Sequence, residues 1–165
     1  ELKDGDIISI DIGVILSGYH SDAARTFPVG NVSEEAKKLI KVTEESFFKG
    51  ISKAVVGNRI VDISTAIQEH VEANGFSVVR DYVGHGIGKE MHEHPQIPNY
   101  RTKERGPRLV PGMTLAIEPM VNAGRYSVKL HSNMWTVMTM DGSLSAHYEN
   151  TIAITEEEPY ILTIL

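Results

Sequence analysis

The segment IISIDIGVILSGYHSDAARTF, residues 7–27, decides how the fold is interpreted. Two β-rich runs, at 6–15 and 20–28, flank a turn in which Gly18 can take a positive φ, and this pattern predicts a β-hairpin. We expect Asp11 to pair with Asp22, with the turn centred on Leu16 and Ser17, so that both aspartates lie on one face. Like charges facing across a ladder repel, and a carboxylate in apolar surroundings is costly unless something pairs with it. The segment therefore raises the question of what pairs with these two acids.

Length and composition limit the classes of protein to consider. At 165 residues the chain fits one domain, 1–165, and its 41% hydrophobic residues include no apolar run long enough to span a membrane. The net charge is −6, and the basic residues form no stripe along the sequence, which argues against nucleic acid as the main partner. There is no cysteine, so any metal must be held by oxygen and imidazole ligands. No signal peptide is recognisable, and we expect a cytoplasmic protein.

The order of the remaining elements predicts an α+β domain. A helix begins after Ser33 and its apolar spacing continues to Gly57, and a second helix covers about 62–74. The glycine-rich stretch from Gly84 to Gly112 is predicted to be a long functional loop. Strands are then expected at 114–122, 134–140, 148–155 and 160–164.

Two further acids stand in strand-like runs, Glu118 in TLAIEPMV and Glu149 in SAHYENTIAI. Any one such acid is explained most simply as a solvated position of a half-exposed sheet. Four of them in four strands, however, indicate a carboxylate cluster with cations between its members.

Histidines of the glycine-rich stretch could complete such a site. His85 lies in GHGIG, whose glycines let the backbone approach closely, and His92 follows in MHEHP. GHGIG lacks the lysine and helix of a phosphate-binding loop. We assign no function to His20, His70, His131 and His147. The single tryptophan, Trp135, is expected in the core, with a pocket wall as the alternative.

Taken in order, Asp11, Asp22, His85, Glu118 and Glu149 make the sequence resemble the methionine aminopeptidases. The resemblance runs along nearly the whole chain, through IDIGVILSGYHSDAARTFPVG, GHGIGKEMHEHPQIPNY, VPGMTLAIEPMVN and WTVMTMDGSLSAHYENTI. The short interval between His92 and Glu118 leaves no room for the subdomain of the type II enzymes, so type I is the closer likeness. HEHPQIPNY distinguishes the chain from proline-specific peptidases of the same fold.

The resemblance implies a pita-bread fold, a curved antiparallel sheet covered by helices, which binds two divalent cations (Co, Mn, Fe or Zn). In that family pattern Asp11 would chelate one metal, Asp22 and Glu149 would bridge both, and His85 and Glu118 would complete the other. Glu118 would also relay a proton, His92 would hydrogen-bond the substrate, and Met91 and Trp135 would lie at the methionine pocket. The implied reaction removes the N-terminal methionine from peptides and nascent proteins.

Several departures from the family pattern modify this expectation. Type I enzymes carry a further N-terminal portion ahead of the segment matching ELKDGD, so we expect an N-terminally truncated domain of reduced or absent activity that self-associates through exposed apolar surface. Asn150 stands where a histidine is usual, and Met91 where an aromatic residue is common. The alternatives are a catalytically silent scaffold of the same fold, a proline-directed peptidase, and an acidic structural domain without metal.

Overall fold

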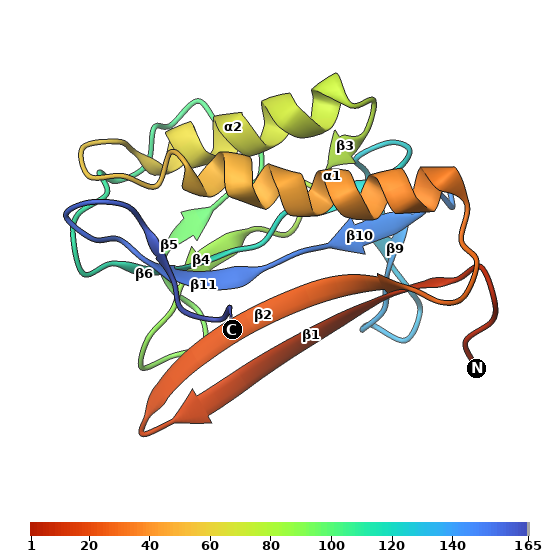
Figure 1. The fold of residues 1–165 in the computed structure, drawn as a ribbon, viewed down its shortest axis with the longest axis horizontal. Helices are drawn as coiled ribbons and strands as arrows, with labels where there is room; N and C mark the ends of the chain where they lie inside the picture. The colour runs from red at the N-terminus through yellow and green to blue at the C-terminus, as the bar shows by residue number, and fades with distance from the viewer. Residues whose placement is uncertain (165) are drawn as a thin grey trace.

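A computed structural model describes residues 1–164 as a hairpin, two helices and a series of short antiparallel strands (Figure 1). The hairpin and helices are β1 (Ile7–Leu16), β2 (Tyr19–Pro28), α1 (Glu34–Ile51) and α2 (Ile60–Ala73). The later strands are β3 (Ser77–Val78), β4 (Gly84–Gly86), β5 (Glu93–Ile97), β6 (Thr114–Ile117), β7 (Met120–Asn122), β8 (Val128–Leu130), β9 (Val137–Thr139), β10 (Ser145–His147), β11 (Asn150–Ala153) and β12 (Tyr160–Ile161). Among them β3, β8 and β10 were not predicted, and β4 and β5 lie in the stretch Gly84–Gly112 that was predicted to be a loop.

The two helices lie side by side over one face of the strands (Figure 1). Ser33 caps α1 by accepting a hydrogen bond from the Ala36 amide at 3.1 Å, as its position before two glutamates predicts. Gly50 permits the close approach of α2, because a Cβ there would lie 2.7 Å from Ile67 Cγ1. In the described part of the chain, neither helix has the length and apolar character needed to cross a membrane.

The prediction that the first helix continues to Gly57 is wrong. The helix ends at Ile51, and the amides of Lys53 and Ala54 then donate to the carbonyls of Gly50 and Ile51. Each of these hydrogen bonds joins residues three apart, as in a 3₁₀ turn, instead of four apart, as in an α-helix. The chain turns here and Ala54 becomes buried. Helical spacing of apolar residues therefore persisted beyond the helix because the following turn also packs against the core.

The central sheet has the strand order β12-β11-β6-β4-β5, and β10-β7-β3 form a second sheet. The hydrophobic core lies between the two helices and these two sheets. It includes Leu39, Phe47, Ile63, Ile67, Leu115, Ile117, Val121 and Ile152. The predicted strand 114–122 is broken at Glu118 and Pro119, so that β6 and β7 join different sheets. β2 lies beside the start of β11, where Ala24 and Glu149 exchange backbone hydrogen bonds of 3.3 and 2.9 Å.

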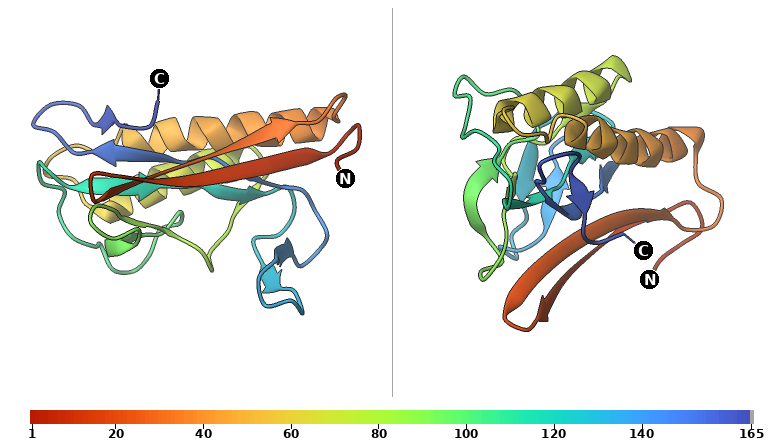
Figure 2. Two further views of the ribbon diagram at one scale, coloured as in Figure 1. Left: turned by 90° about the horizontal axis from the view of Figure 1, so that it is seen from below. Right: turned by 60° about the vertical axis from the view of Figure 1, so that its left-hand side comes forward.

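The predicted register of the hairpin is also wrong. Asp11 lies opposite Ala24 and Asp22 lies opposite Gly13, because the turn falls on Ser17 and Gly18, with φ of 52° and 82°. A two-residue turn with positive φ at both positions matches the right-handed twist of the strands. The error amounts to two residues on one strand, so both aspartates still point to the same face as diagonal neighbours. The hairpin extends away from the helices, as the right-hand view in Figure 2 shows.

GHG, predicted as the start of a long loop, is instead the strand β4, paired with β5 on one side and β6 on the other. A Cβ on Gly84 would overlap the Ala116 carbonyl oxygen, and one on Gly86 would overlap the His94 carbonyl oxygen. Glycine is needed here for close backbone approach within the sheet, not for a loop conformation.

Candidate metal centre

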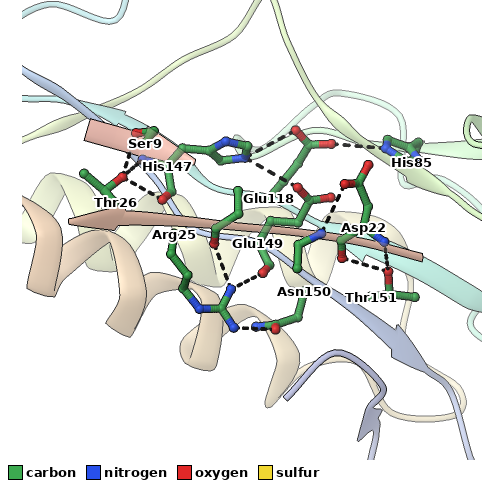
Figure 3. Close-up of polar contacts among 12 residues, drawn as sticks. Ser9, Asp22, Arg25, Thr26, His85, Glu118, His147, Glu149, Asn150 and Thr151 are labelled. Carbon is green, nitrogen blue, oxygen red and sulfur yellow. Dashed lines mark hydrogen bonds and ion pairs between the residues drawn. The ribbon is translucent and has the colours of Figure 1, made fainter. Parts of the chain in front are cut away.

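Acidic and imidazole side chains from four parts of the chain meet where β2, β4, β6 and β11 lie together (Figure 3). Asp22 comes from β2, His85 from β4, Glu118 directly follows β6, and Glu149 directly precedes β11. Thr151 fixes the backbone of Asp22, since its Oγ1 accepts from the Asp22 amide at 2.8 Å and donates to the Asp22 carbonyl at 3.0 Å. The sheet therefore fixes the backbone that carries these side chains.

The donor atoms form two groups that share Glu149. One ligand atom each from Asp22, His85 and Glu149 lie within 4.8 Å of one another, and the same holds for Glu118, His147 and Glu149. Glu118 joins the groups, with Oε1 3.4 Å from His85 Nε2 and Oε2 3.6 Å from His147 Nε2. Two carboxylates and an imidazole in each group form a mixed oxygen and nitrogen donor set, which suits first-row transition metals.

Burial of the acids makes the cluster unfavourable without cations. Glu149 is 1% exposed, and burial, then repulsion from Glu118, Asp22 and Asp11, raises its pKa to about 10, although Arg25 acts in the opposite direction. Burial and the neighbouring Asp11 carboxyl likewise raise the pKa of Asp22. Within residues 1–164, Glu149 Oε1 and His147 Nε2 are buried and have no hydrogen-bond partner. These unpartnered polar atoms and the crowding of carboxyl groups fit bound divalent cations.

A contact within its own strand orients the His85 ring. Its Nδ1 lies 2.9 Å from the Gly86 carbonyl oxygen, which can only accept a hydrogen bond. Nδ1 therefore carries the proton, and in the neutral ring Nε2 presents a lone pair toward Glu118.

Asp11 and His92 lie at the open side of the cluster. Both are exposed and line a cavity of about 400 Å³ together with His85, Glu118 and His147. The rings of His92 and His85 meet edge to face with centroids 4.4 Å apart. The apolar wall of this cavity consists of Val79, Tyr82, Val83, Met120, Val128, Val137 and Met138.

The two other predicted pocket residues lie outside this lining. Met91 covers Gly13 of the hairpin, where a Cβ would overlap the methionine Cε. Trp135 is 86% exposed, so the expectation that it belongs to the core is wrong. It sits in the tight turn between β8 and β9, where Asn133 Oδ1 accepts from the Trp135 and Thr136 amides.

Sequence reasoning missed His147 and Arg25. In a predicted strand, residues two positions apart point to the same face, so His147 could have been expected to point the same way as Glu149. This spacing was the available signal in the sequence. Arg25 donates to the carbonyls of Ala24 and Glu149 and, at 2.7 Å, to Asn150 Oδ1, while it stacks 4.1 Å above the Tyr148 ring. Asn150, at a position where the resemblance implied histidine, thus helps to anchor the strand that carries Glu149.

Comparison with known proteins places this geometry in a family. Residues 1–156 match the family model for metallopeptidase family M24. The chain is 67% identical over 165 residues to methionine aminopeptidase of Clostridium perfringens, covering 100% of this chain and 66% of the relative. The structure of methionine aminopeptidase from Thermotoga maritima superposes with a TM-score of 0.96 at 51% identity over 99% of this chain and 66% of that one. Prolidase from Pyrococcus furiosus superposes less closely, with a TM-score of 0.78, 26% identity and coverage of 99% and 43%.

These comparisons confirm the predicted α+β pita-bread fold and the resemblance to methionine aminopeptidases. The chain spans about two thirds of the length of the curated relatives it matches.

Proposed function

The chain belongs to metallopeptidase family M24, and from this premise we propose that it is the metal-binding part of an aminopeptidase that removes N-terminal methionine from peptides and nascent proteins. The observation that carries the proposal is the pair of donor groups joined at Glu149, inside a fold shared with methionine aminopeptidases. We further propose that residues 1–165 act as one domain, in the cytosol, where new protein N-termini become available.

Two divalent ions, Co, Mn, Fe or Zn, would be held by Asp11, Asp22, His85, Glu118 and Glu149. Such ions supply Lewis acidity that activates water and polarises a peptide carbonyl. The side chains of the cluster and cavity contribute the remaining functions: holding the substrate, moving the proton and shaping the pocket.

In the proposed reaction Glu118 moves the proton. Its carboxylate borders the cavity between His85 and His147 and is reachable from it. It takes a proton from water as the water oxygen bonds to the substrate carbonyl carbon, and it gives that proton to the amine nitrogen as the carbon–nitrogen bond breaks. His92, exposed at the cavity mouth, donates a hydrogen bond to the substrate next to the scissile bond.

The apolar wall of the cavity suits the methionine side chain of the substrate. A thioether side chain is flexible and polarizable, and it packs well against Tyr82 and Met138. We also propose that Trp135 and Met91 contact the substrate, although in the free chain they lie outside the cavity lining. Substrate binding would then require the β8–β9 hairpin and the segment at Met91 to move toward the cavity.

Turnover of two peptides tests the proposed function. The metal-reconstituted chain should release methionine from Met-Ala-Ser, and Glu118→Ala should lose this activity. Glu69→Gln, an exposed change on α2, is the matched control. Release of the first residue from an Xaa-Pro peptide instead would indicate the proline-directed alternative. Metal-loaded protein inactive on both peptides would support the scaffold hypothesis for this chain.

The outer face of the hairpin supports self-association. Five large apolar side chains there are 43–76% exposed: Ile10, Ile12, Val14, Leu16 and Tyr19. Such a row of exposed apolar side chains commonly marks an association surface, and within residues 1–164 β1 pairs with β2 on one side only, which leaves its other edge open. We propose that a second copy of the chain covers this face in solution.

A further inference from the structure

His147 occupies a position in the cluster that the ligand pattern expected from the family resemblance leaves unused. Its Nε2 is 3.6 Å from Glu118 Oε2 and 3.9 Å from Glu149 Oε2, and Figure 3 shows the ring pointing toward both carboxylates. In the described chain this nitrogen is buried and has no hydrogen-bond partner. A buried polar atom without a partner requires an explanation, and an adjacent ion provides one.

The distances from His147 Nε2 to the two carboxylate oxygens are those expected between ligands of one ion, and they are too long for direct hydrogen bonds. Both distances exceed the usual range for an N–H···O hydrogen bond, about 2.7–3.2 Å. Two donor atoms each about 2.1 Å from one ion, at a tetrahedral angle, lie about 3.4 Å apart. Small side-chain adjustments therefore suffice to place Glu118, His147 and Glu149 around one cation.

The backbone holds the His147 ring at this place. Thr26 Oγ1 accepts from the His147 amide and donates to its carbonyl, both at 2.8 Å, and Ser9 Oγ lies 2.7 Å from the same hydroxyl. β10 also pairs His147 with Met120 of β7. A residue clamped in this way from two strands is preorganised and needs little ordering when an ion binds.

We propose that His147 is a sixth protein ligand of the metal centre, through Nε2, where it would join Glu118 and Glu149 beside one cation. A second imidazole in the centre favours Zn or Fe over Mg and Ca. This inference rests on the metal centre of the proposed function and extends its ligand set.

Cobalt spectroscopy provides a direct test, because the chain contains no cysteine. His147→Cys introduces the only thiol, and a thiolate bound to Co(II) gives an intense near-ultraviolet charge-transfer band. We expect that band upon addition of Co(II) to His147→Cys, and no such band in a matched His131→Cys control, whose side chain lies on the exposed β8–β9 hairpin. Absence of the band in a folded, cobalt-loaded His147→Cys protein would overturn the inference.

Metal titration of His147→Gln gives an independent readout. The Kd of at least one ion should rise about 10-fold or more, since loss of a group that only hydrogen-bonds a ligand already costs about 10- to 100-fold, and X-ray absorption should find fewer imidazoles per metal than in the parent chain. Unchanged affinities and imidazole number for both ions would refute the ligand role of His147 while leaving the proposed function standing. A parent chain that binds no divalent ion, tested alongside Glu149→Gln, would refute both. Circular dichroism in EDTA checks that each variant folds.

Discussion

Glu149→Gln should stabilise the metal-free chain while it removes metal binding. The carboxyl is almost fully buried beside three other acids, and its pKa rises from 4.5 to about 10. At neutral pH the folded chain must therefore keep a proton on Glu149, or bury its charge, whereas the unfolded chain ionises freely. Glutamine has the shape of the protonated acid and has no such penalty.

The size and sign of the effect follow from linkage. Between pH 4.5 and 10 the folded state binds the proton that the unfolded state has released, so the stability of the metal-free chain falls as pH rises through this window. A difference of 2.5 pH units between the unfolded pKa and pH 7, at about 1.4 kcal/mol per unit, gives a penalty of about 3 kcal/mol at pH 7. Below pH 4.5 the penalty disappears, because the side chain is protonated in both states.

Urea denaturation in EDTA, followed by circular dichroism, measures this difference. At pH 7 the free energy of unfolding of Glu149→Gln should exceed that of the parent by about 3 kcal/mol, and at pH 4 the two should agree. Glu69→Gln makes the same chemical change at an exposed site and should show no such pH dependence. The reasoning fails if Glu149→Gln is the less stable protein at pH 7, or if both proteins depend on pH equally.

Three further results are expected from the fold. Gly86→Ala should destabilise the chain by about 1–3 kcal/mol or more in the same urea assay, since its Cβ would overlap the His94 carbonyl oxygen in a strand paired on both sides. Arg25→Ala should cost about 1.5–3 kcal/mol, because it removes charged donors from the Glu149 carbonyl and from Asn150 Oδ1, which keep only the Ala24 amide and the Thr163 hydroxyl, and stability equal to the parent would contradict this account. Ile12→Lys should lower the mass measured by sedimentation velocity to that of a monomer, and an already monomeric parent chain would disprove self-association.

The sequence indicated which acids converge more reliably than it indicated the exact strand geometry. Acids inside apolar strand-like runs violate the local pattern, and such violations are expected where function demands them, so Asp22 and Glu149 could be singled out from the sequence as a pair that lies close together. The hairpin register was missed because Leu16, Ser17 and Gly18 allow more than one turn, and only the twist of the strands selects between them.

The wrong predictions for GHG, His147 and Trp135 share a physical cause. The same residue type can occur in different structural environments, and contacts distant in sequence decide between them. Glycine in GHG suits a loop as well as a crowded central strand, and only the neighbouring carbonyls, distant in sequence, decide. A histidine such as His147 becomes notable only when β10 places it beside Glu118. Tryptophan is a large apolar residue and is usually found in the core, yet a local hydrogen-bonded turn holds Trp135 in solvent.

The stability prediction for Glu149 and the ligand role proposed for His147 lead to one expectation about the origin of this fold's stability. A cluster that weakens the metal-free chain gains its largest stabilisation when cations bind, because the burial and repulsion that raise the pKa of Glu149 are then offset by attraction to the ions. The free energy of unfolding should consequently depend on metal concentration far more in the parent chain than in Glu149→Gln. The pH dependence of the parent should also flatten at saturating metal, because the ion then takes the place of the proton that Glu149 would otherwise keep.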